Sequence, residues 1–257
     1  MSIRISSDVY TEVSPTHEVN EDFVLVGQDF VIVLDGATPV AGLETGCIHD
    51  VPWLVRQLGL RLAEGITAPS DAGLATLLER AIEQVCEAHA DTCDLDDPNS
   101  PSSTVALLRV RGGRADYLTL ADSFVVFRMA DGSIREITDD RLDHLDDYSV
   151  AAFGAARNTH DGFWVASTVP EAARHAVTGS IDLGSQQVRS AAVLTDGAAT
   201  LVERNGWTWE QLLDLFDRGP EELVRRTREA DEVATAGFHG KRHDDATAVL
   251  CRLTDSV

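Results

Sequence analysis

Several acidic residues lie where apolar, strand-like runs begin or end. They are Glu21 and Asp22 before the run 23–26, Asp35 after 31–34, Asp122 between two such runs, Asp196 after 192–195, and Asp244 and Asp245 before 246–253. Carboxylates at strand ends can converge at one edge of a sheet, and oxygen donors without a histidine–cysteine pattern suit hard cations. The sequence therefore predicts a candidate site for Mg²⁺ or Mn²⁺.

Two of these acids share a local pattern. Asp35-Gly36 and Asp196-Gly197 each follow an apolar run, and each precedes an alanine. A glycine lets the backbone turn tightly and leaves its carbonyl open as a ligand. A single Asp-Gly step is typical of an ordinary hairpin turn, and that alternative stays open for either step alone. The repetition favours one shared site.

The elements that would position these acids follow from hydrophobic spacing. Apolar runs at 23–26 and 30–34, separated by Gly27-Gln28-Asp29, predict a hairpin. Apolar residues at helical spacing predict helices over 46–66 and 70–90, the second with Ser70 as its N-cap.

The second half of the chain alternates between strand and helix patterns. The predicted elements are an antiparallel meander at 104–110, 115–120, 124–129 and 134–137, a strand at 188–194, helices at 209–217 and 221–235, and a last strand at 246–253. Runs of antiparallel strands with helices in blocks predict an α+β fold with sheets covered by helices. They do not predict a doubly wound parallel sheet.

Composition limits the classes of function. The chain has 257 residues, 21 basic and 43 acidic, with a formal net charge of −22. This charge argues against binding of nucleic acid or of an anionic membrane surface. It would also repel a phosphorylated substrate unless bound cations reverse the local field. No apolar run is long enough to span a membrane and no secretory pattern opens the chain, so we expect one cytoplasmic, monomeric domain over 1–257.

Soft metal ligands are sparse in the sequence. None of the four cysteines (Cys47, Cys86, Cys93 and Cys251) forms a CxxC pair, so we expect neither a zinc knuckle nor a thioredoxin-type site. His239 and His243 are four residues apart but lack a third soft partner, which favours a polar loop over a zinc site.

Six short segments occur in an order that resembles a known family. They are Asn20-Glu21-Asp22, Asp35-Gly36 after its strand, Ser102-Ser103-Thr104-Val105, Ala121-Asp122-Ser123, Leu194-Thr195-Asp196-Gly197 and Asp244-Asp245-Ala246-Thr247. Together they resemble a divergent bacterial member of the metal-dependent type 2C serine/threonine protein phosphatases over 15–253. The resemblance implies an α-β-β-α sandwich of two antiparallel sheets covered by helix pairs.

The resemblance also implies a mechanism. Asp35 would bridge two Mg²⁺ or Mn²⁺ ions, the Gly36 carbonyl would complete the second ion, and Asp196 and Asp244 would hold the first. The acids that would bind metal-bound water without touching the metal are Glu21, Asp22 and Asp245. A water activated by the metals would then attack phosphorus directly in a phosphoserine or phosphothreonine of a protein substrate.

The sequence departs from the family pattern in three places. His17 stands where the family usually has a phosphate-binding arginine, and Asp35 to Pro39 lacks the usual histidine. His17 could replace either group as a catalytic residue, or it could be a solvated loop residue. Asp122 matches a ligand of a third ion, but Thr200 stands where the second acid should be. The alternative function is a non-catalytic domain that binds phosphoprotein partners.

Overall fold

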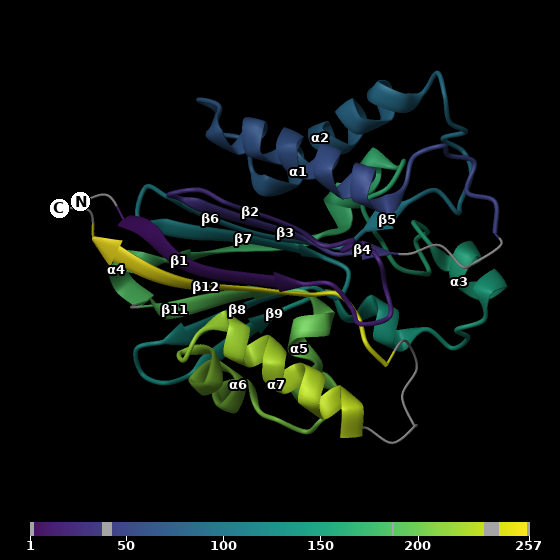
Figure 1. The fold of residues 1–257 in the computed structure, drawn as a ribbon. Helices are drawn as coiled ribbons and strands as arrows, with labels where there is room; N and C mark the ends of the chain where they lie inside the picture. Colours follow the sequence, from purple (N-terminus) through teal and green to yellow (C-terminus); the bar gives the residue numbers. More distant parts are fainter. Residues whose placement is uncertain (1–2, 38–42, 187, 234–241, 256–257) are drawn as a thin grey trace.

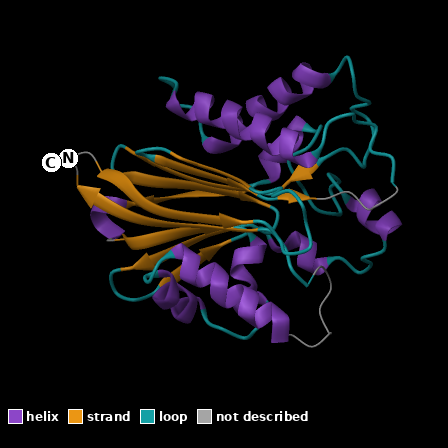
Figure 2. Cartoon of the chain, viewed as in Figure 1, coloured by secondary structure: helices purple, strands orange, loops and turns teal. Residues whose placement is uncertain are grey.

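Two five-stranded antiparallel sheets lie face to face in the computed structural model, which describes residues 3–37, 43–186, 188–233 and 242–255 (Figures 1 and 2). Sheet I has the order β1 (Ile3–Glu12), β12 (Ala246–Asp255), β11 (Val188–Leu194), β8 (Phe124–Met129), β9 (Ile134–Ile137). Sheet II has the order β10 (Val177–Asp182), β7 (Arg114–Leu120), β6 (Val105–Arg111), β3 (Phe30–Leu34), β2 (Phe23–Val26). A short pair, β4 (Gly36–Ala37) with β5 (Ser102–Ser103), extends beyond sheet II.

Helices cover the outer face of each sheet (Figure 1). Sheet II carries α1 (Val51–Thr67) and α2 (Leu74–His89), and sheet I carries α5 (Asp196–Glu203), α6 (Trp209–Phe216) and α7 (Pro220–Val233). The smaller helices are α3 (Val150–Ala156), α4 (Leu183–Gln186) and the 3₁₀ turns Asp140–His144 and Pro170–His175. This arrangement confirms the predicted α+β sandwich of two antiparallel sheets covered by helices.

The central strands are apolar on both faces because each sheet is buried on both sides. In β3, Ile32 packs with the helices above sheet II, whereas Val31 and Val33 pack into the core between the sheets. In β11, Leu194 faces the helices of sheet I and Val193 faces the inter-sheet core. Three stacked cores thus explain why these strands appear as continuous apolar runs rather than alternating ones.

The first two helices begin later than the spacing predicts. Helix α1 begins at Val51 because Asp50 accepts a hydrogen bond from the Trp53 amide at 2.9 Å and a proline lies in the first turn. Helix α2 begins at Leu74 because the Ser70 hydroxyl is used in a local turn, accepting from the Ala72 amide at 3.2 Å. A side-chain cap thus sets the start of α1, whereas α2 starts after Gly73 without a side-chain cap.

The predicted four-strand meander is wrong as a single sheet. β6 and β7 pair in sheet II, whereas β8 and β9 pair in sheet I. The chain changes sheet at Ala121, whose φ of 60° lies in the left-handed region. Asp139 holds this turn, since its Oδ2 accepts from the Ala121 amide at 3.1 Å and its own amide donates to the Ala121 carbonyl at 3.3 Å. The crossover places Asp122 where the ends of both sheets meet.

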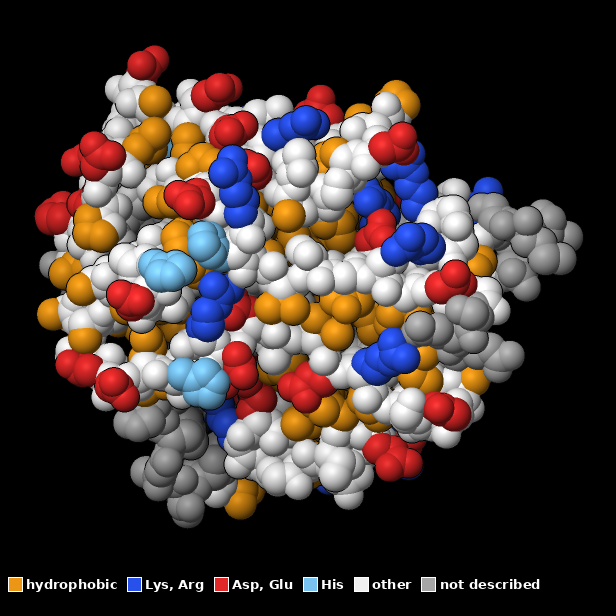
Figure 3. Space-filling model, turned by 180° about the vertical axis from the view of Figure 1, so that it is seen from behind, with side chains coloured by type: hydrophobic (Ala, Val, Ile, Leu, Met, Phe, Trp, Pro, Cys, Tyr) orange, Lys and Arg blue, Asp and Glu red, His pale blue; other side chains and the backbone are white. Residues whose placement is uncertain are grey.

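The described surface mixes charges of both signs. On the reverse face in Figure 3, basic side chains are dispersed among acidic, apolar and polar ones rather than gathered into one field. Within the described part of the chain, every helix is too short or too polar to serve as a membrane span.

Candidate metal centre

The acids expected at strand ends converge on one buried edge of the sandwich. Burial raises the pKa of Asp35 well above its ordinary value. The carboxylates whose charges add to this rise are Asp22, Asp196, Asp244 and Asp122. Residues more than 200 positions apart thus share one site, in which the carboxylates repel one another in the absence of cations.

Asp22 is held by hydroxyl groups from the two C-terminal motifs. Its Oδ2 accepts from Thr247 Oγ1 at 2.6 Å and from Thr195 Oγ1 at 3.2 Å. Burial, together with the charges of the neighbouring aspartates, raises its pKa well above the ordinary value although the Thr247 hydrogen bond lowers it. Its Oδ1 is buried and has no hydrogen-bond partner. The two threonine hydroxyls therefore hold one oxygen of Asp22, and the other oxygen is available to a cation or to water.

Asp245 braces the backbone around the site. Its Oδ1 accepts from the Ser14 amide at 2.7 Å, and its Oδ2 accepts from the Glu21 amide at 2.6 Å. Asp245 also donates its own amide to Asp244 Oδ1 at 3.0 Å. Both Asp245 oxygens thus hold the segment that carries Glu21 against the segment that carries Asp244 and Asp245.

The two Asp-Gly glycines are required by close approach rather than by turn conformation. A Cβ on Gly36 would lie 2.6 Å from the Glu21 carbonyl oxygen, and one on Gly197 would lie 2.0 Å from the Asp245 carbonyl oxygen. Neither glycine has a positive φ. The repeated pattern therefore reflects two places where an acidic segment packs directly on the neighbouring backbone.

Asp196 does not lie in a hairpin turn but opens helix α5. Its Oδ1 is buried without a hydrogen-bond partner, and its Oδ2 lies 3.6 Å from Nη2 of Arg204. Arg204 was not among the predicted site residues, because it follows Asp196 by eight positions and matches no motif. The structure thus adds an arginine to a site for which the sequence predicts acids, the Gly36 carbonyl and His17.

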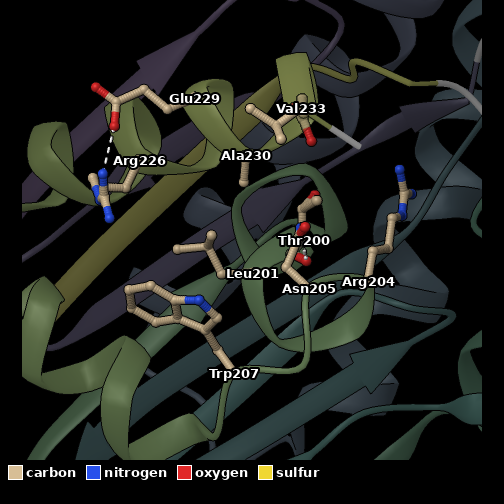
Figure 4. A pocket seen from close by; sticks show the side chains of 10 residues that line it. Thr200, Leu201, Arg204, Asn205, Trp207, Arg226, Glu229, Ala230 and Val233 are labelled. Carbon is tan, nitrogen blue, oxygen red and sulfur yellow. Dashed lines mark hydrogen bonds and ion pairs between the residues drawn. The ribbon is translucent and has the colours of Figure 1, made fainter. Parts of the chain in front are cut away.

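A cavity of about 1450 Å³ opens beside this edge. It is lined by Asp122, Asp196, Glu203 and Arg204 among others, and Arg204 is the only basic residue among the described residues that line it. Burial, and then the charge of Asp196, raises the pKa of Asp122 to about 7. A second pocket of about 660 Å³, with Arg204 at its margin and Trp207 on its wall, lies between α5 and α7 (Figure 4).

His17 lies at the site and not in a solvated loop. Its Nδ1 is 3.5 Å from Asp245 Oδ1 and is buried without a hydrogen-bond partner, although 22% of the side chain is exposed. At the position expected for a third-ion acid, Thr200 Oγ1 donates to the Gly197 carbonyl at 3.1 Å. His239, Thr38 and Pro39 lie outside the described residues, and His243 Nδ1 lies 3.5 Å from Asp231 Oδ2.

The donor set fits hard divalent cations. Two buried carboxylate oxygens, Asp22 Oδ1 and Asp196 Oδ1, lack a hydrogen-bond partner, and the carboxylates of Asp35 and Asp244 are among their neighbours. An unpaired buried carboxylate is costly, and a Mg²⁺ or Mn²⁺ ion offsets that cost by direct coordination. The edge that carries Asp35, Asp196 and Asp244 therefore also holds two buried carboxylate oxygens, one from Asp22 and one from Asp196, that suit such an ion.

Comparison with known proteins identifies the family. The sequence model of the family described as Protein phosphatase 2C matches residues 16–233. The chain therefore belongs to the protein phosphatase 2C family. No curated protein matches the sequence at a significant level.

Solved structures of bacterial phosphatases share the fold. The serine/threonine phosphatase Stp1 from Staphylococcus aureus superposes with a TM-score of 0.67 at 13% identity, covering 98% of this chain and 96% of that one. MsPP, a PPM Ser-Thr phosphatase from Mycobacterium smegmatis in complex with cacodylate, gives 0.62 at 19% identity, covering 99% and 100%. The catalytic domain of the phosphatase PstP, in complex with two manganese ions, gives 0.61 at 15% identity, covering 99% and 100%.

Proposed function

We propose that this chain is a Mg²⁺- or Mn²⁺-dependent phosphatase that removes phosphate from phosphoserine or phosphothreonine in proteins. The observation that carries this proposal is the grouping of Asp35, Asp196 and Asp244 at one buried edge, where Asp22 Oδ1 and Asp196 Oδ1 lack hydrogen-bond partners. Membership of the protein phosphatase 2C family supports the same reaction class.

Two ions would be held by Asp35, the Gly36 carbonyl, Asp196 and Asp244. When bound, the ions supply an activated water for attack on phosphorus and neutralise the phosphoryl oxygens. Glu21 and Asp22 would orient water at the rim of the ion pair. Asp245 would act through the backbone, since both of its oxygens already accept amide hydrogens from Ser14 and Glu21.

Two residues are candidates for the missing phosphate contact. Arg204 can present a planar guanidinium to phosphoryl oxygens, and it already lies beside Asp196 at the cavity wall. His17 lies beside Asp245, where it can donate a proton to the leaving oxygen or to the phosphate. Asp122 would hold a third ion only if water replaced the second acidic ligand, because Thr200 stands at the position of that acid.

We propose further that residues 1–257 form one domain that acts as a monomer on phosphoproteins in the cytoplasm, without nucleic acid or membrane partners. The net charge of −22 supports this, because it repels nucleic acid and anionic lipid. The four cysteines are free thiols, as expected in a reducing compartment.

Hydrolysis assays test the proposed reaction. An aryl phosphate, a phosphothreonine peptide and a phosphotyrosine peptide are assayed with Mn²⁺, with Mg²⁺ and with a chelator. We expect metal-dependent turnover of the first two substrates, and loss of more than about a hundredfold in Asp35→Asn, beyond the range for residues that only orient ligands.

Asp131→Asn is the matched control, because Asp131 lies in the exposed turn between β8 and β9. Manganese binding without turnover of any substrate would instead support the alternative, a non-catalytic domain that binds phosphoproteins. The departures at His17 and after Gly36 are the features that favour this alternative.

A further inference from the structure

A second group of metal-binding side chains lies away from the carboxylate centre. One ligand atom each from Cys47, His89 and Cys93 lies within 4.8 Å of the others. Cys47 precedes helix α1, His89 is the last residue of α2, and Cys93 follows in the next loop. The two sulfur atoms are 2.8 Å apart, and both cysteines are free thiols. The fold thus brings the distant Cys47 to His89 and Cys93, which are four residues apart in the sequence.

The hydrogen bonding of His89 prepares its ring to bind a metal. Its Nδ1 lies 2.5 Å from the Val85 carbonyl oxygen, and the residue is only 5% exposed. A carbonyl can only accept, so this contact assigns the proton to Nδ1 and leaves Nε2 of the neutral ring with a lone pair. Histidines that ligate metals commonly donate their other ring N–H to a backbone carbonyl in this way.

The sulfur atoms lie among donors that stabilise negative charge. The Ile48 amide donates to Cys93 Sγ at 3.4 Å. Although burial raises it, hydrogen bonds from Cys47 and from the amides of Ile48 and His49 lower the pKa of Cys93 below its ordinary value. Burial and the contact with Cys93 raise the pKa of Cys47 to about 11. The close sulfur pair and the Ile48 amide thus form one pocket for a cation, which displaces the thiol protons when it binds both sulfur atoms.

We propose that Cys47, His89 and Cys93 bind Zn²⁺, or a similarly soft divalent cation, in a structural site separate from the carboxylate centre. Two thiolates and one imidazole match the donors that zinc selects, whereas Mg²⁺ prefers oxygen. Three protein ligands leave the fourth tetrahedral position to water or to His49. The His49 ring stacks on Trp53 at 3.9 Å and lies 6.0 Å from the His89 ring.

The zinc ion would fasten a loop that supports the carboxylate centre. The chain beyond Cys93 bonds back to the segment before α1, where the Asp94 amide donates to the Gly46 carbonyl at 2.7 Å. The same loop leads into β5, whose Ser103 pairs with Gly36. The Thr104 amide then donates to the Asp35 carbonyl at 2.9 Å. The proposed site therefore closes a loop whose far end holds the Asp35-Gly36 step.

Metal analysis of the whole chain tests this proposal. Protein purified under reducing conditions in excess Mg²⁺ should retain about one zinc per chain. Cobalt substitution should give a sulfur-to-cobalt charge-transfer band. Both signals should be lost in Cys47→Ala and Cys93→Ala, and His89→Ala should bind zinc at least about tenfold more weakly. Circular dichroism checks that each variant is folded. Cys93→Ala is the variant least expected to disturb folding, because Cys93 is only partly buried.

Two control variants make the assignment specific. Cys86→Ala removes a thiol from the same helix α2, where Cys86 Sγ contacts the Thr168 carbonyl at 3.5 Å, and should keep the zinc. Asp35→Asn should also keep it, which separates this site from the carboxylate centre and from the proposed phosphatase activity.

Several results would overturn the proposal. One is the absence of zinc from reduced protein with four reactive thiols. Another is zinc content that is unchanged in both Cys47→Ala and Cys93→Ala. A third is a Cys47–Cys93 disulfide in protein purified without added oxidant. It would appear as two fewer reactive thiols and a mass lower by two hydrogens.

Discussion

The carboxylate centre and the Cys47–His89–Cys93 cluster show two ways in which one chain gathers metal donors. The first buries oxygen atoms from distant strand ends, and burial, together with repulsion between the carboxylates, raises the pKa of Asp22 and Asp35. The second joins a helix terminus to a loop with sulfur and nitrogen donors. Because hard and soft donors select different cations, we expect each site to take its own cation, although the loop of the second leads to the Asp35-Gly36 step of the first.

Loss of a proposed ligand at the carboxylate centre should have the largest effect, and it should affect this site without affecting the cysteine–histidine site. Asp196→Asn removes a carboxylate whose Oδ1 is buried without a partner, so we expect complete loss of manganese binding and of turnover. Zinc content should stay at about one per chain, because the soft site shares no residue with this one. Calorimetry with Mn²⁺ and zinc analysis measure both effects on one sample. Zinc loss in this variant would show that the two sites are coupled.

The repulsion among the acids should appear as a pH dependence of the metal-free protein. Burial and Asp196 raise the pKa of Asp122 from 3.8 to about 7, so the folded state binds this proton more tightly than the unfolded chain. Stability is therefore greatest at acidic pH and falls as the pH rises from about 4 to 7, by up to about 4 kcal/mol for this group. Urea unfolding in chelator measures the free energy at each pH.

Asp122→Asn should make that pH dependence less steep, with Asp22 and Asp35 contributing the rest, and the exposed Asp131→Asn should leave it unchanged between about pH 4 and 7. Added Mn²⁺ should also suppress it in the wild-type protein, because bound cations remove the cost of ionising neighbouring carboxylates. An equally steep profile in Asp122→Asn would contradict the assigned environment of this residue.

The two candidate phosphate contacts should differ in kinetic effect. Arg204→Ala removes a cation from the cavity wall and should raise KM about tenfold, the scale of one charge-assisted hydrogen bond. His17→Ala should instead lower kcat and remove an acid limb from the pH–rate profile. Steady-state kinetics with a phosphothreonine peptide separate these outcomes. Unchanged KM and kcat in both variants would mean that neither residue replaces the missing arginine.

Removal of zinc should have the smallest effect and should be confined to the loop that it closes. Amides of residues 91–100 should exchange about tenfold faster in Cys93→Ala, since local opening no longer breaks metal–ligand bonds. Core amides of β3 and β11 should keep their protection. Hydrogen exchange followed by mass spectrometry checks this, with Cys86→Ala as the comparison. Slower or unchanged exchange in residues 91–100 would argue against a metal clamp.

The features that sequence predicted well are local or periodic. The apolar runs of β2, β3, β8, β9 and β11 appear at their predicted positions because strand burial depends on hydrophobic spacing. β1 was missed, since only Ile5 of its ten residues is buried and the strand is held mainly by backbone pairing with β12. Helix α5 was missed because its short apolar stretch follows Asp-Gly, which is typical of a turn.

The sequence by itself determined the α+β class and which acids lie at the buried edge of the sandwich. Both follow from where apolar runs begin and end along the chain. Only the tertiary structure decided the change of sheet at Ala121, the reach of Arg204 to Asp196, and the meeting of Cys47 with His89 and Cys93. Each of these depends on how packed elements orient their side chains in space, which the hydrophobic spacing of the sequence does not specify.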